Sequence, residues 1–497
     1  MSTFIIGGNG TQPITLETST LNRHGLIAGA TGTGKTVTLQ VCVEQLSEAG
    51  IAVFVADIKG DLSGLSVAGA SHKKVTERLD YIGIKNHLFK AMPTVFWDVF
   101  GKLGHPIRTT ISELGPLLLA HLLELNETQT GVLYACFKEA DDNGLLMLDI
   151  DDLTAMLAYL SDNAKDLRSR YGNINTASIG AIRRSLLILE EQGATHFFGE
   201  PALALSDLIK TDSSGAGVVN ILDVTQLMQT SPRLYATILV WLLSELFEEL
   251  PEVGDLEKPK FVLFLDEAHL IFDGSSKSLA DKFEQVVRLI RSKGVGVIFV
   301  TQSPLDIPEQ ILGQLGFKIQ HALRAFTPKD QKTLKSVADS FRPNPAFDTK
   351  TILPELGIGE ALVSTLDDKG RISAVEKTLL SPPSSKIGAI SAAERSQKIQ
   401  QSAVLSKYEH SINRESAYEQ LAKRAEQKLH DDEKVKTENQ ERENHQQNAP
   451  STPQPKARSS NRQSTGEAFV KSMSRALGSQ IGRQIVRGIL GSLFKNK

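Results

Sequence analysis

The feature that most constrains the fold of this chain is the octapeptide Gly-Ala-Thr-Gly-Thr-Gly-Lys-Thr at residues 29–36. A short apolar run, residues 24–28, precedes it, and a pattern with helical spacing, residues 37–46, follows it. A glycine-rich turn between a strand and a helix gathers backbone N–H groups and the positive end of the helix dipole around one point, which suits a phosphate group. The sequence therefore predicts a nucleoside triphosphate site within an α/β fold.

Each part of this turn has an expected task. Gly29 and Gly34 can adopt backbone angles that a Cβ atom forbids, so that the N–H groups of the loop can face the phosphates. Lys35 is expected to reach the β- and γ-phosphates of ATP, and the Thr36 hydroxyl is expected to hold Mg²⁺. The expected nucleotide-binding residues are Gly29, Ala30, Thr31, Gly32, Thr33, Gly34, Lys35, Thr36 and Val37.

Residues 1–380 have the hydrophobic pattern of a mostly parallel sheet. Short runs of Val, Ile, Leu and Phe alternate with helical patterns, as expected when helices cover both faces of a sheet. We expect core strands at residues 25–28, 51–57, 94–99, 218–224, 261–266 and 295–301, and later strands at 317–323, 361–366 and 372–378. Residues 112–192 are helical and poor in strands, which predicts an inserted helical subdomain, and residues 232–250 predict a long amphipathic helix.

The composition changes after residue 380. The run Ser-Pro-Pro-Ser-Ser at 381–385 predicts the end of the fold, and residues 389–445 are rich in Glu, Lys, Gln and Ala, which predicts an exposed helical segment that could self-associate. Residues 446–465 have the composition of a disordered linker, so that 381–466 as a whole is expected to connect two ordered parts. Residues 467–497 predict a basic amphipathic helix.

This basic C-terminal tail could interact with its surroundings in three ways. It could pack against the rest of the chain or a protein partner, lie on a membrane surface, or contact the backbone of a nucleic acid. Glycines at 478, 482, 488 and 491 weaken an isolated helix and permit close helix–helix approach, which favours packing against protein.

Composition excludes several other classes of protein. A formal net charge of −3 with 40% hydrophobic residues describes a soluble globular protein rather than a uniformly basic nucleic-acid binder. The two cysteines, Cys42 and Cys136, lie far apart in apolar helical stretches, which excludes a disulfide framework and a thiolate metal cluster. With no signal peptide pattern and no apolar run long enough to span a bilayer, a cytoplasmic location is expected.

A second motif places two carboxylates at the end of a predicted buried strand. The apolar run at 261–265 leads directly into Asp266 and Glu267. Ligands of open α/β sheets bind at the carboxyl ends of strands, so both acids are expected beside the phosphates. Asp266 is the expected Mg²⁺ ligand, and Glu267 is the expected group that polarises the attacking water.

Two further polar segments follow predicted strands. Gln302 comes directly after the strand at 295–301 and could contact the γ-phosphate or the attacking water, although it could also simply cap the next loop. Asp57 begins the segment Asp-Ile-Lys-Gly-Asp-Leu at 57–62 and could serve Mg²⁺ or position its own loop.

The ordered set GATGTGKT, DIKGDL, LFLDEAH and VIFVTQS resembles the HerA/FtsK superfamily of ring-forming, nucleic-acid-pumping ATPases, and in particular the bacterial HerA-like proteins. The resemblance covers roughly residues 5–380 together with the basic tail, and it implies a RecA-like P-loop NTPase fold. It also implies nucleotide binding by Gly32, Gly34, Lys35 and Thr36, and a sensor role for Gln302. The archaeal HerA pattern has a β-barrel ahead of its phosphate loop, for which a loop starting at Gly29 leaves no room.

The family also uses an arginine that the neighbouring subunit supplies. Arg291 matches that position best because it lies shortly before the strand that ends at Gln302. Arg288 and Arg324 are the alternatives.

Together the motifs predict a Mg²⁺-dependent ATP hydrolase. The resemblance implies that it assembles as a homo-oligomer, expected to be a hexameric ring, and moves along double-stranded DNA. The alternative is a nucleotide-switched scaffold in which ATP sets the oligomeric state and the tail recruits a protein or membrane partner. An intact Glu267 favours the hydrolase, because nucleotide binding alone needs no residue that activates water.

Overall fold

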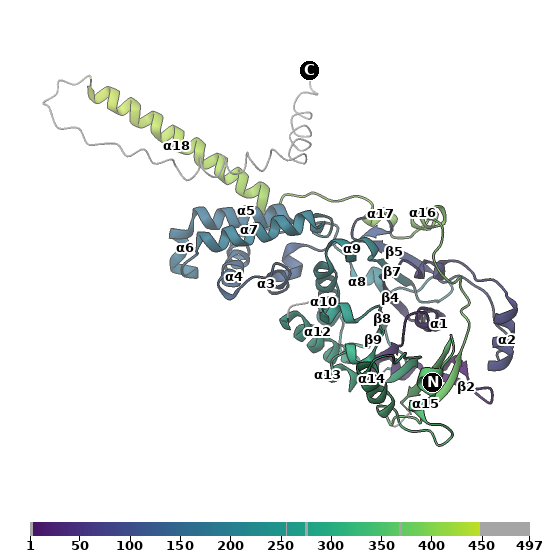
Figure 1. Ribbon diagram of the computed structural model, residues 1–497. Helices are drawn as coiled ribbons and strands as arrows, with labels where there is room; N and C mark the ends of the chain where they lie inside the picture. Colours follow the sequence, from purple (N-terminus) through teal and green to yellow (C-terminus); the bar gives the residue numbers. More distant parts are fainter. Residues whose placement is uncertain (1–2, 255, 274–276, 367–369, 448–497) are drawn as a thin grey trace. The chain divides into compact units, whose positions relative to one another are not determined.

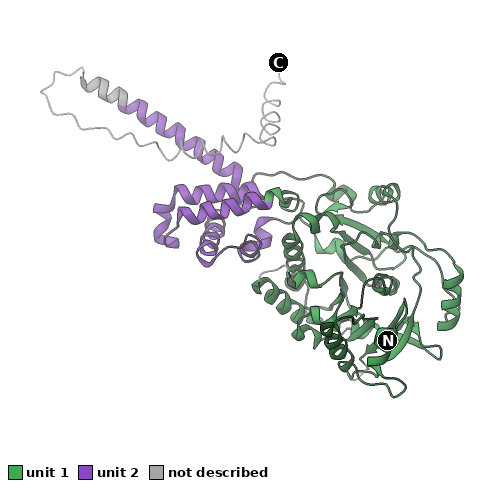
Figure 2. Ribbon diagram, viewed as in Figure 1, with its two compact units in different colours: residues 1–109, 190–411 green, residues 110–189, 412–497 purple. Residues whose placement is uncertain are grey.

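A computed structural model describes residues 3–254, 256–273, 277–366 and 370–447 of the chain (Figure 1). The chain forms two compact units, one comprising residues 1–109 and 190–411 and the other residues 110–189 and 412–497 (Figure 2). The predicted basic helix at 467–497 and nearly all of the predicted linker at 446–465 lie outside the described residues. Among the described helices, none combines the length and apolar character needed to cross a bilayer.

The first unit is built on a sheet with twelve described strands, in the order β2-β1-β12-β11-β10-β3-β9-β8-β4-β7-β5-β6. Neighbouring strands from β10 to β6 run parallel, whereas β11, β12, β1 and β2 add antiparallel pairs at one side. The strands are β1 (Thr3–Gly8), β2 (Pro13–Glu17), β3 (Gly25–Ala28), β4 (Ala52–Asp57), β5 (Thr94–Asp98), β6 (His105–Pro106), β7 (Val219–Asp223), β8 (Phe261–Leu265), β9 (Val295–Thr301), β10 (Phe317–His321), β11 (Glu360–Thr365) and β12 (Glu376–Leu380).

The prediction of a mostly parallel α/β sheet is confirmed. The central strands β3, β4, β8 and β9 are buried at every position, which explains their continuous apolar sequences. The edge strand β2 alternates exposed and buried residues, but a two-residue period is hard to recognise in a strand of five residues. Neither β1 nor β2 was predicted from the sequence. The last predicted strand, 372–378, lies later in the structure, because the pairing of β12 with β11 begins at Glu376.

Helices cover both faces of this sheet. The α-helices of the first unit are α1 (Lys35–Glu48), α2 (Lys73–Ile82), α8 (Leu205–Leu208), α9 (Thr225–Thr230), α10 (Pro232–Glu249), α11 (His269–Asp273), α12 (Lys277–Ile290), α13 (Glu309–Leu312), α14 (Pro328–Asp339), α15 (Thr349–Glu355), α16 (Ala392–Gln400) and α17 (Leu405–Tyr408). Short 3-10 helices are η1 (Thr18–Arg23), η2 (Leu62–Ser66), η3 (Ala194–His196), η4 (Arg291–Lys293) and η5 (Pro304–Asp306).

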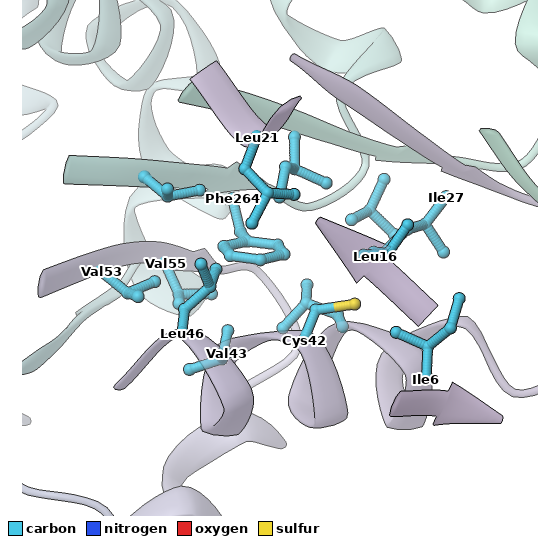
Figure 3. Close-up of a cluster of buried hydrophobic side chains, with 14 of the residues drawn as sticks. Ile6, Leu16, Leu21, Ile27, Cys42, Val43, Leu46, Val53, Val55 and Phe264 are labelled. Atoms are coloured by element: carbon cyan, nitrogen blue, oxygen red, sulfur yellow. The ribbon is translucent and has the colours of Figure 1, made fainter. Parts of the chain in front are cut away.

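Helix α1 packs on one face through a single apolar cluster. Cys42, Val43 and Leu46 of this helix contact a layer that includes Val55 of β4 and Phe264 of β8 (Figure 3). All these side chains are at most 1% exposed, so the phosphate loop that precedes α1 is anchored to the buried core of the sheet.

Helix α12 covers the opposite face. Phe283 of α12 lies with its ring centroid 6.3 Å from that of Phe299 in β9. In β9 the neighbours Ile298 and Val300 belong to the cluster beneath α1, and successive strand residues point to opposite faces. The sheet is therefore a buried middle layer between two helical layers.

The second unit consists of α3 (Ile111–Leu122), α4 (Glu127–Asp142), α5 (Ile150–Asp162), α6 (Ala164–Tyr171), α7 (Thr176–Glu191) and α18 (Ala417–Gln447). Helix α18 comes from beyond the sheet in sequence but packs on α5. Its first residues are held by hydrogen bonds from Ala417 N to Leu146 O (2.8 Å) and from Tyr418 N to Asp152 Oδ1 (2.8 Å). The segment predicted to be exposed therefore has one anchored end.

The boundary predicted at residue 380 lies later in the structure, because residues 381–411 belong to the first unit. Ser384 and Ser385 are buried against α1, where the Glu44 carboxylate accepts hydrogen bonds from Ser384 N (2.7 Å), Ser385 N (2.8 Å) and the Ser385 hydroxyl. The Ser-Pro-rich composition predicts the end of the folded domain. In the structure these small polar residues instead donate hydrogen bonds to the buried carboxylate of Glu44.

We expect Glu44→Ala to lower the free energy of unfolding by about 3 kcal/mol, since it removes the acceptor of several buried donors, each worth about 1–3 kcal/mol. Urea denaturation measures this change, and limited proteolysis at residues 381–390 should accelerate. Glu48→Ala is the matched control, because Glu48 lies one turn later in α1 and forms a surface ion pair with Lys90. Equal effects of the two substitutions would contradict the anchoring role of Glu44.

Candidate functional site

The carboxyl ends of the parallel strands form one edge of the sheet, and the phosphate loop lies along it. Gly29 N donates to Thr301 O at the end of β9 (3.2 Å), and Ala30 N donates to Ala322 O just after β10 (2.8 Å). These bonds fix the start of the loop to the strands on both sides of β3. The folded chain thus brings segments some 300 residues apart to one place.

The loop has the backbone conformation that its glycines permit. Gly29, Gly32 and Gly34 have φ values of 149°, 77° and 111°, which side-chain-bearing residues rarely adopt. A Cβ on Gly29 would lie 2.5 Å from the Cβ of His321, so this position also needs the smallest residue for close approach. A Cβ on Gly32, by contrast, would meet no atom of the described residues within 4 Å apart from its chain neighbours, which leaves open space in front of the loop.

Lys35 folds back over the loop that it belongs to. Its Nζ donates to Gly29 O (2.7 Å) and Ala30 O (3.1 Å), and the side chain is buried. Burial lowers the pKa of Lys35, and the charges of Glu267 and Asp266 partly oppose this shift. Thr36 and Val37 lie half-buried in the first turn of α1.

Asp266 and Glu267 follow β8 directly and are both buried. Asp266 Oδ1 accepts a hydrogen bond from Glu267 N (2.9 Å), whereas its Oδ2 is a buried oxygen without a hydrogen-bond partner among the described residues. Burial raises the pKa of Asp266 to about 6, against the lowering effect of the Lys59 charge. Glu267 adopts a φ of 44°, a left-handed conformation that is uncommon for a residue other than glycine and is often found at functional sites.

Glu267 is paired with Lys59, a contact that no sequence motif indicated. Lys59 Nζ lies 2.7 Å from Glu267 Oε1, and the two side chains are 41% and 9% exposed. Burial would raise the pKa of Glu267, but the hydrogen bond and charge of Lys59 and the charge of Lys35 outweigh it, so that the pKa is lowered. The same hydrogen bond and the nearby acids raise the pKa of Lys59 despite its partial burial.

These residues fit a magnesium–triphosphate group. The Asp266 Oδ2 atom provides the hard oxygen donor that Mg²⁺ or its bound water prefers, and Thr36 provides a hydroxyl at the N-terminus of α1. The open space before Gly32 and the buried ammonium group of Lys35 suit the phosphates.

Asp57 holds the loop that carries Lys59. Its two carboxylate oxygens accept hydrogen bonds from Gly60 N (2.7 Å) and Leu62 N (3.1 Å). Of the two roles left open by the sequence, these bonds favour positioning of the loop over binding of Mg²⁺. Burial raises the pKa of Asp57 to about 7, with further contributions from the charges of Asp61 and Asp223.

The shifted pKa of Asp57 predicts a pH-dependent stability. The folded chain keeps a proton on Asp57 up to about pH 7, whereas the unfolded chain releases it near pH 3.8. The folded state binds more protons between these values, so the free energy of unfolding should fall as pH rises through this window. Urea denaturation from about pH 4.5 to 7.5 should give a flatter curve for Asp57→Asn, and parallel curves would contradict the assignment.

His321 is a second residue whose place in the site the sequence did not reveal. It ends β10, is fully buried, and its Nε2 lies 2.9 Å from the Thr38 hydroxyl of α1. Burial lowers the pKa of His321 to about 4, with a contribution from the charge of Lys35, so its imidazole is neutral at pH 7. A polar residue at the carboxyl end of a strand was the available signal, since strand ends of this kind line the site.

Gln302 lies at the same edge, directly after β9, and is exposed. The loop around it is fixed by Asp306, whose Oδ2 accepts hydrogen bonds from the Thr301 hydroxyl (2.7 Å) and Ser303 N (2.9 Å). Capping of this loop is therefore performed by Asp306, and the Gln302 amide is left accessible to a ligand or another subunit.

Arg291 lies at the amino end of β9, whereas the phosphate loop lies at the carboxyl ends of the parallel strands. It begins η4, and β9 starts four residues later and runs to Thr301. A seven-residue strand is about 20 Å long at about 3.3 Å per residue, so Arg291 is separated from the phosphate loop of its own chain by the height of the sheet. Arg288 is exposed on α12 and Arg324 is exposed just after β10, with its Nη1 donating to Pro354 O (3.2 Å).

Comparisons with known proteins identify the family of the chain. Residues 3–497 match the family described as "Helicase HerA-like C-terminal". The chain is 33% identical over 120 residues to a probable helicase, MJECL08, of Methanocaldococcus jannaschii. The matched region covers 23% of this chain and 21% of that protein. It is 23% identical over 370 residues to the DNA double-strand break repair helicase HerA of Sulfolobus acidocaldarius, which covers 72% of this chain and 65% of that protein. The chain thus spans less than two thirds of the length of either relative.

The fold is similar to that of the bacterial conjugative coupling protein TrwBdeltaN70, with a TM-score of 0.52 and 13% sequence identity over 76% of this chain and 89% of that one. The chain belongs to the family described as "Helicase HerA-like C-terminal".

Proposed function

We propose that this HerA-like chain hydrolyses ATP in a Mg²⁺-dependent reaction at the edge of its sheet and uses the energy to move along double-stranded DNA. The observation that carries the proposal is the position of Asp266 and Glu267 directly after β8, at the same end of the parallel strands β3, β9 and β8 as the phosphate loop with its buried Lys35. A binder that never hydrolyses its nucleotide would need neither the second acid nor its strained backbone.

The site residues divide the work by their chemistry. The loop N–H groups and Lys35 bind the phosphates and orient the terminal one, and Thr36 and Asp266 hold the metal. When bound, Mg²⁺ neutralises charge that develops on the phosphate oxygens. Glu267 orients a water molecule and accepts its proton through a carboxylate oxygen, and Gln302 contacts the terminal phosphate or that water.

A ring of identical subunits, which we propose to be a hexamer, would supply the remaining group. Arg291 lies too far along the sheet to serve its own site, so we propose that it enters the site of a neighbouring subunit and stabilises the charge of the transition state. Hydrolysis in one site would then depend on the position of the next subunit, which is the coupling that a motor requires.

The second candidate function is a nucleotide-switched scaffold. It is favoured by α18, which is anchored on α5 at its first residues and whose following residues up to 439 are mostly exposed and rich in charge. Such a helix, with the basic tail beyond it, offers a surface for a protein or membrane partner without any need for DNA.

The steady-state rate of ATP hydrolysis with and without double-stranded DNA separates the two functions. Strong stimulation by DNA, absent in Lys35→Ala and Glu267→Gln proteins, is the result expected for a DNA motor. A rate indifferent to DNA would reject translocation and favour the scaffold. Absence of any magnesium-dependent hydrolysis would reject both the mechanism and the motor.

A further inference from the structure

Glu267, which we propose activates the attacking water, forms an ion pair with Lys59 in this structure. Glu267 Oε1 lies 2.7 Å from Lys59 Nζ, and Oε2 lies 3.5 Å from His269 Nδ1. One carboxylate oxygen of Glu267 is thus committed to an ammonium group, whereas Oε2 is buried and has no hydrogen-bond partner among the described residues. The structure therefore shows Glu267 paired with Lys59 through one of its two carboxylate oxygens.

The two partners differ in how freely they can leave this pair. Glu267 is held by the strained backbone that follows β8 and by its N–H bond to Asp266. The backbone of the Lys59 loop is fixed by Asp57, but the lysine side chain is 41% exposed and has four rotatable methylene groups. If the pair opens, the ammonium group of Lys59 is the part that moves.

A suitable destination for this ammonium group lies close by. Glu267 follows β8, and the carboxyl end of β8 lies on the same side of the sheet as the phosphate loop after β3, because β3, β9 and β8 are parallel neighbours. The Lys59 ammonium group, 2.7 Å from Glu267 Oε1, therefore lies at the end of the sheet where the terminal phosphate is expected. A terminal phosphate carries more negative charge than the single carboxylate of Glu267 and competes with it for Lys59. A nucleoside diphosphate lacks this competitor.

We propose that Lys59 is a positioning residue that senses the γ-phosphate: it pairs with Glu267 until ATP binds, then transfers to the γ-phosphate and releases Glu267 for water. This inference rests on the proposed ATP site. It assigns to the second residue after Asp57 in the segment at 57–62 a task that is distinct from phosphate binding by Lys35.

Isothermal titration calorimetry on the full chain with Mg²⁺ tests the transfer, using a non-hydrolysable ATP analogue and ADP. If Lys59 leaves Glu267 when the analogue binds, Glu267→Gln removes an ion pair that binding must otherwise break. It should then tighten analogue binding about fivefold in the wild-type background and by less in a Lys59→Met background, where no pair exists. ADP affinity should change by less than about twofold in both backgrounds, within the size of a surface ion-pair effect.

If the Lys59–Glu267 pair persists in the ATP-bound state, Glu267→Gln should increase analogue affinity more in the Lys59→Met background than in the wild-type background. Lys59 would then already neutralise Glu267, so Glu267→Gln would help more in the Lys59→Met background, where the carboxylate repels the γ-phosphate. That order, or equal gains in both backgrounds, would overturn the transfer. A wild-type chain that binds neither nucleotide would instead reject the ATP site itself, so the two failures are distinguishable.

Two controls separate sensing from general loss of charge or structure. Lys59→Arg keeps the positive charge and should preserve the wild-type order of gains. Lys90→Met removes a lysine of similar exposure (45%) whose 2.9 Å ion pair with Glu48 lies outside the site, and it should leave the effect of Glu267→Gln unchanged. A change as large as that caused by Lys59→Met would show that the effect is not specific to the site.

Discussion

Arg291→Ala is expected to lower the rate of ATP hydrolysis by about 10³–10⁵-fold while ATP affinity stays near that of the wild type. An arginine that a neighbouring subunit supplies stabilises charge only in the transition state, so its loss affects the rate rather than binding. The measurement is a steady-state ATPase assay together with calorimetric titration of a non-hydrolysable ATP analogue.

Mixing two inactive proteins tests whether Arg291 acts between subunits. Arg291→Ala chains keep an intact phosphate loop, and Lys35→Ala chains keep an intact arginine. If the site is shared, a mixture of the two regains part of the ATPase rate, whereas neither protein alone does. Arg288→Ala, on the same helical segment, and Arg324→Ala are the matched controls and should retain most of the activity. An Arg291→Ala protein with a normal rate would reject the assignment.

Glu267→Gln is expected to lower the hydrolysis rate by about 10²–10⁴-fold and to leave ATP bound. The amide has nearly the same size as the carboxylate but cannot accept a proton from water. The backbone N–H bond to Asp266 does not involve the side chain, so the metal ligand keeps its partner in the variant. Single-turnover hydrolysis measured beside nucleotide binding separates the two steps.

Lys35→Ala provides the contrast for this second prediction. It should abolish nucleotide binding, because it removes the ammonium group that we propose binds the phosphates, and the hydrolysis rate would fall for that reason. If Glu267→Gln loses binding to the same extent as Lys35→Ala, or hydrolyses ATP at the wild-type rate, Glu267 is not the residue that activates water.

Much of the fold could be predicted because its strongest signals are local. The strand β8 reads Phe-Val-Leu-Phe-Leu and is buried at all five positions, so a continuous apolar run was sufficient to place it in the centre of a parallel sheet. The phosphate loop was equally clear, since its positive-φ glycines and its lysine occur within eight consecutive residues. For β1 and β2 the signal was weaker, because short edge strands carry little pattern and β1 pairs on one side with β12, far away in sequence.

The site itself was only partly visible in the sequence. Asp266, Glu267, Lys35 and Thr36 belong to motifs, and the parallel pairing of β3, β9 and β8 brings both motifs to the same end of the sheet. Lys59 contacts Glu267, which lies 208 residues later in the sequence. His321 contacts Thr38, which lies 283 residues earlier. No local spacing rule reports a contact of that kind.

By itself the sequence determined what depends on neighbouring residues: the phosphate loop, the acids at a strand end, the apolar strands of a parallel sheet and the family to which the chain belongs. Only the tertiary structure decided which side chains meet, namely that Lys59 neutralises Glu267, that Glu44 of α1 holds residues 384 and 385, and that α18 packs on α5. The physical reason is that burial and ion pairing depend on distances in space, which the folding of the whole sheet sets.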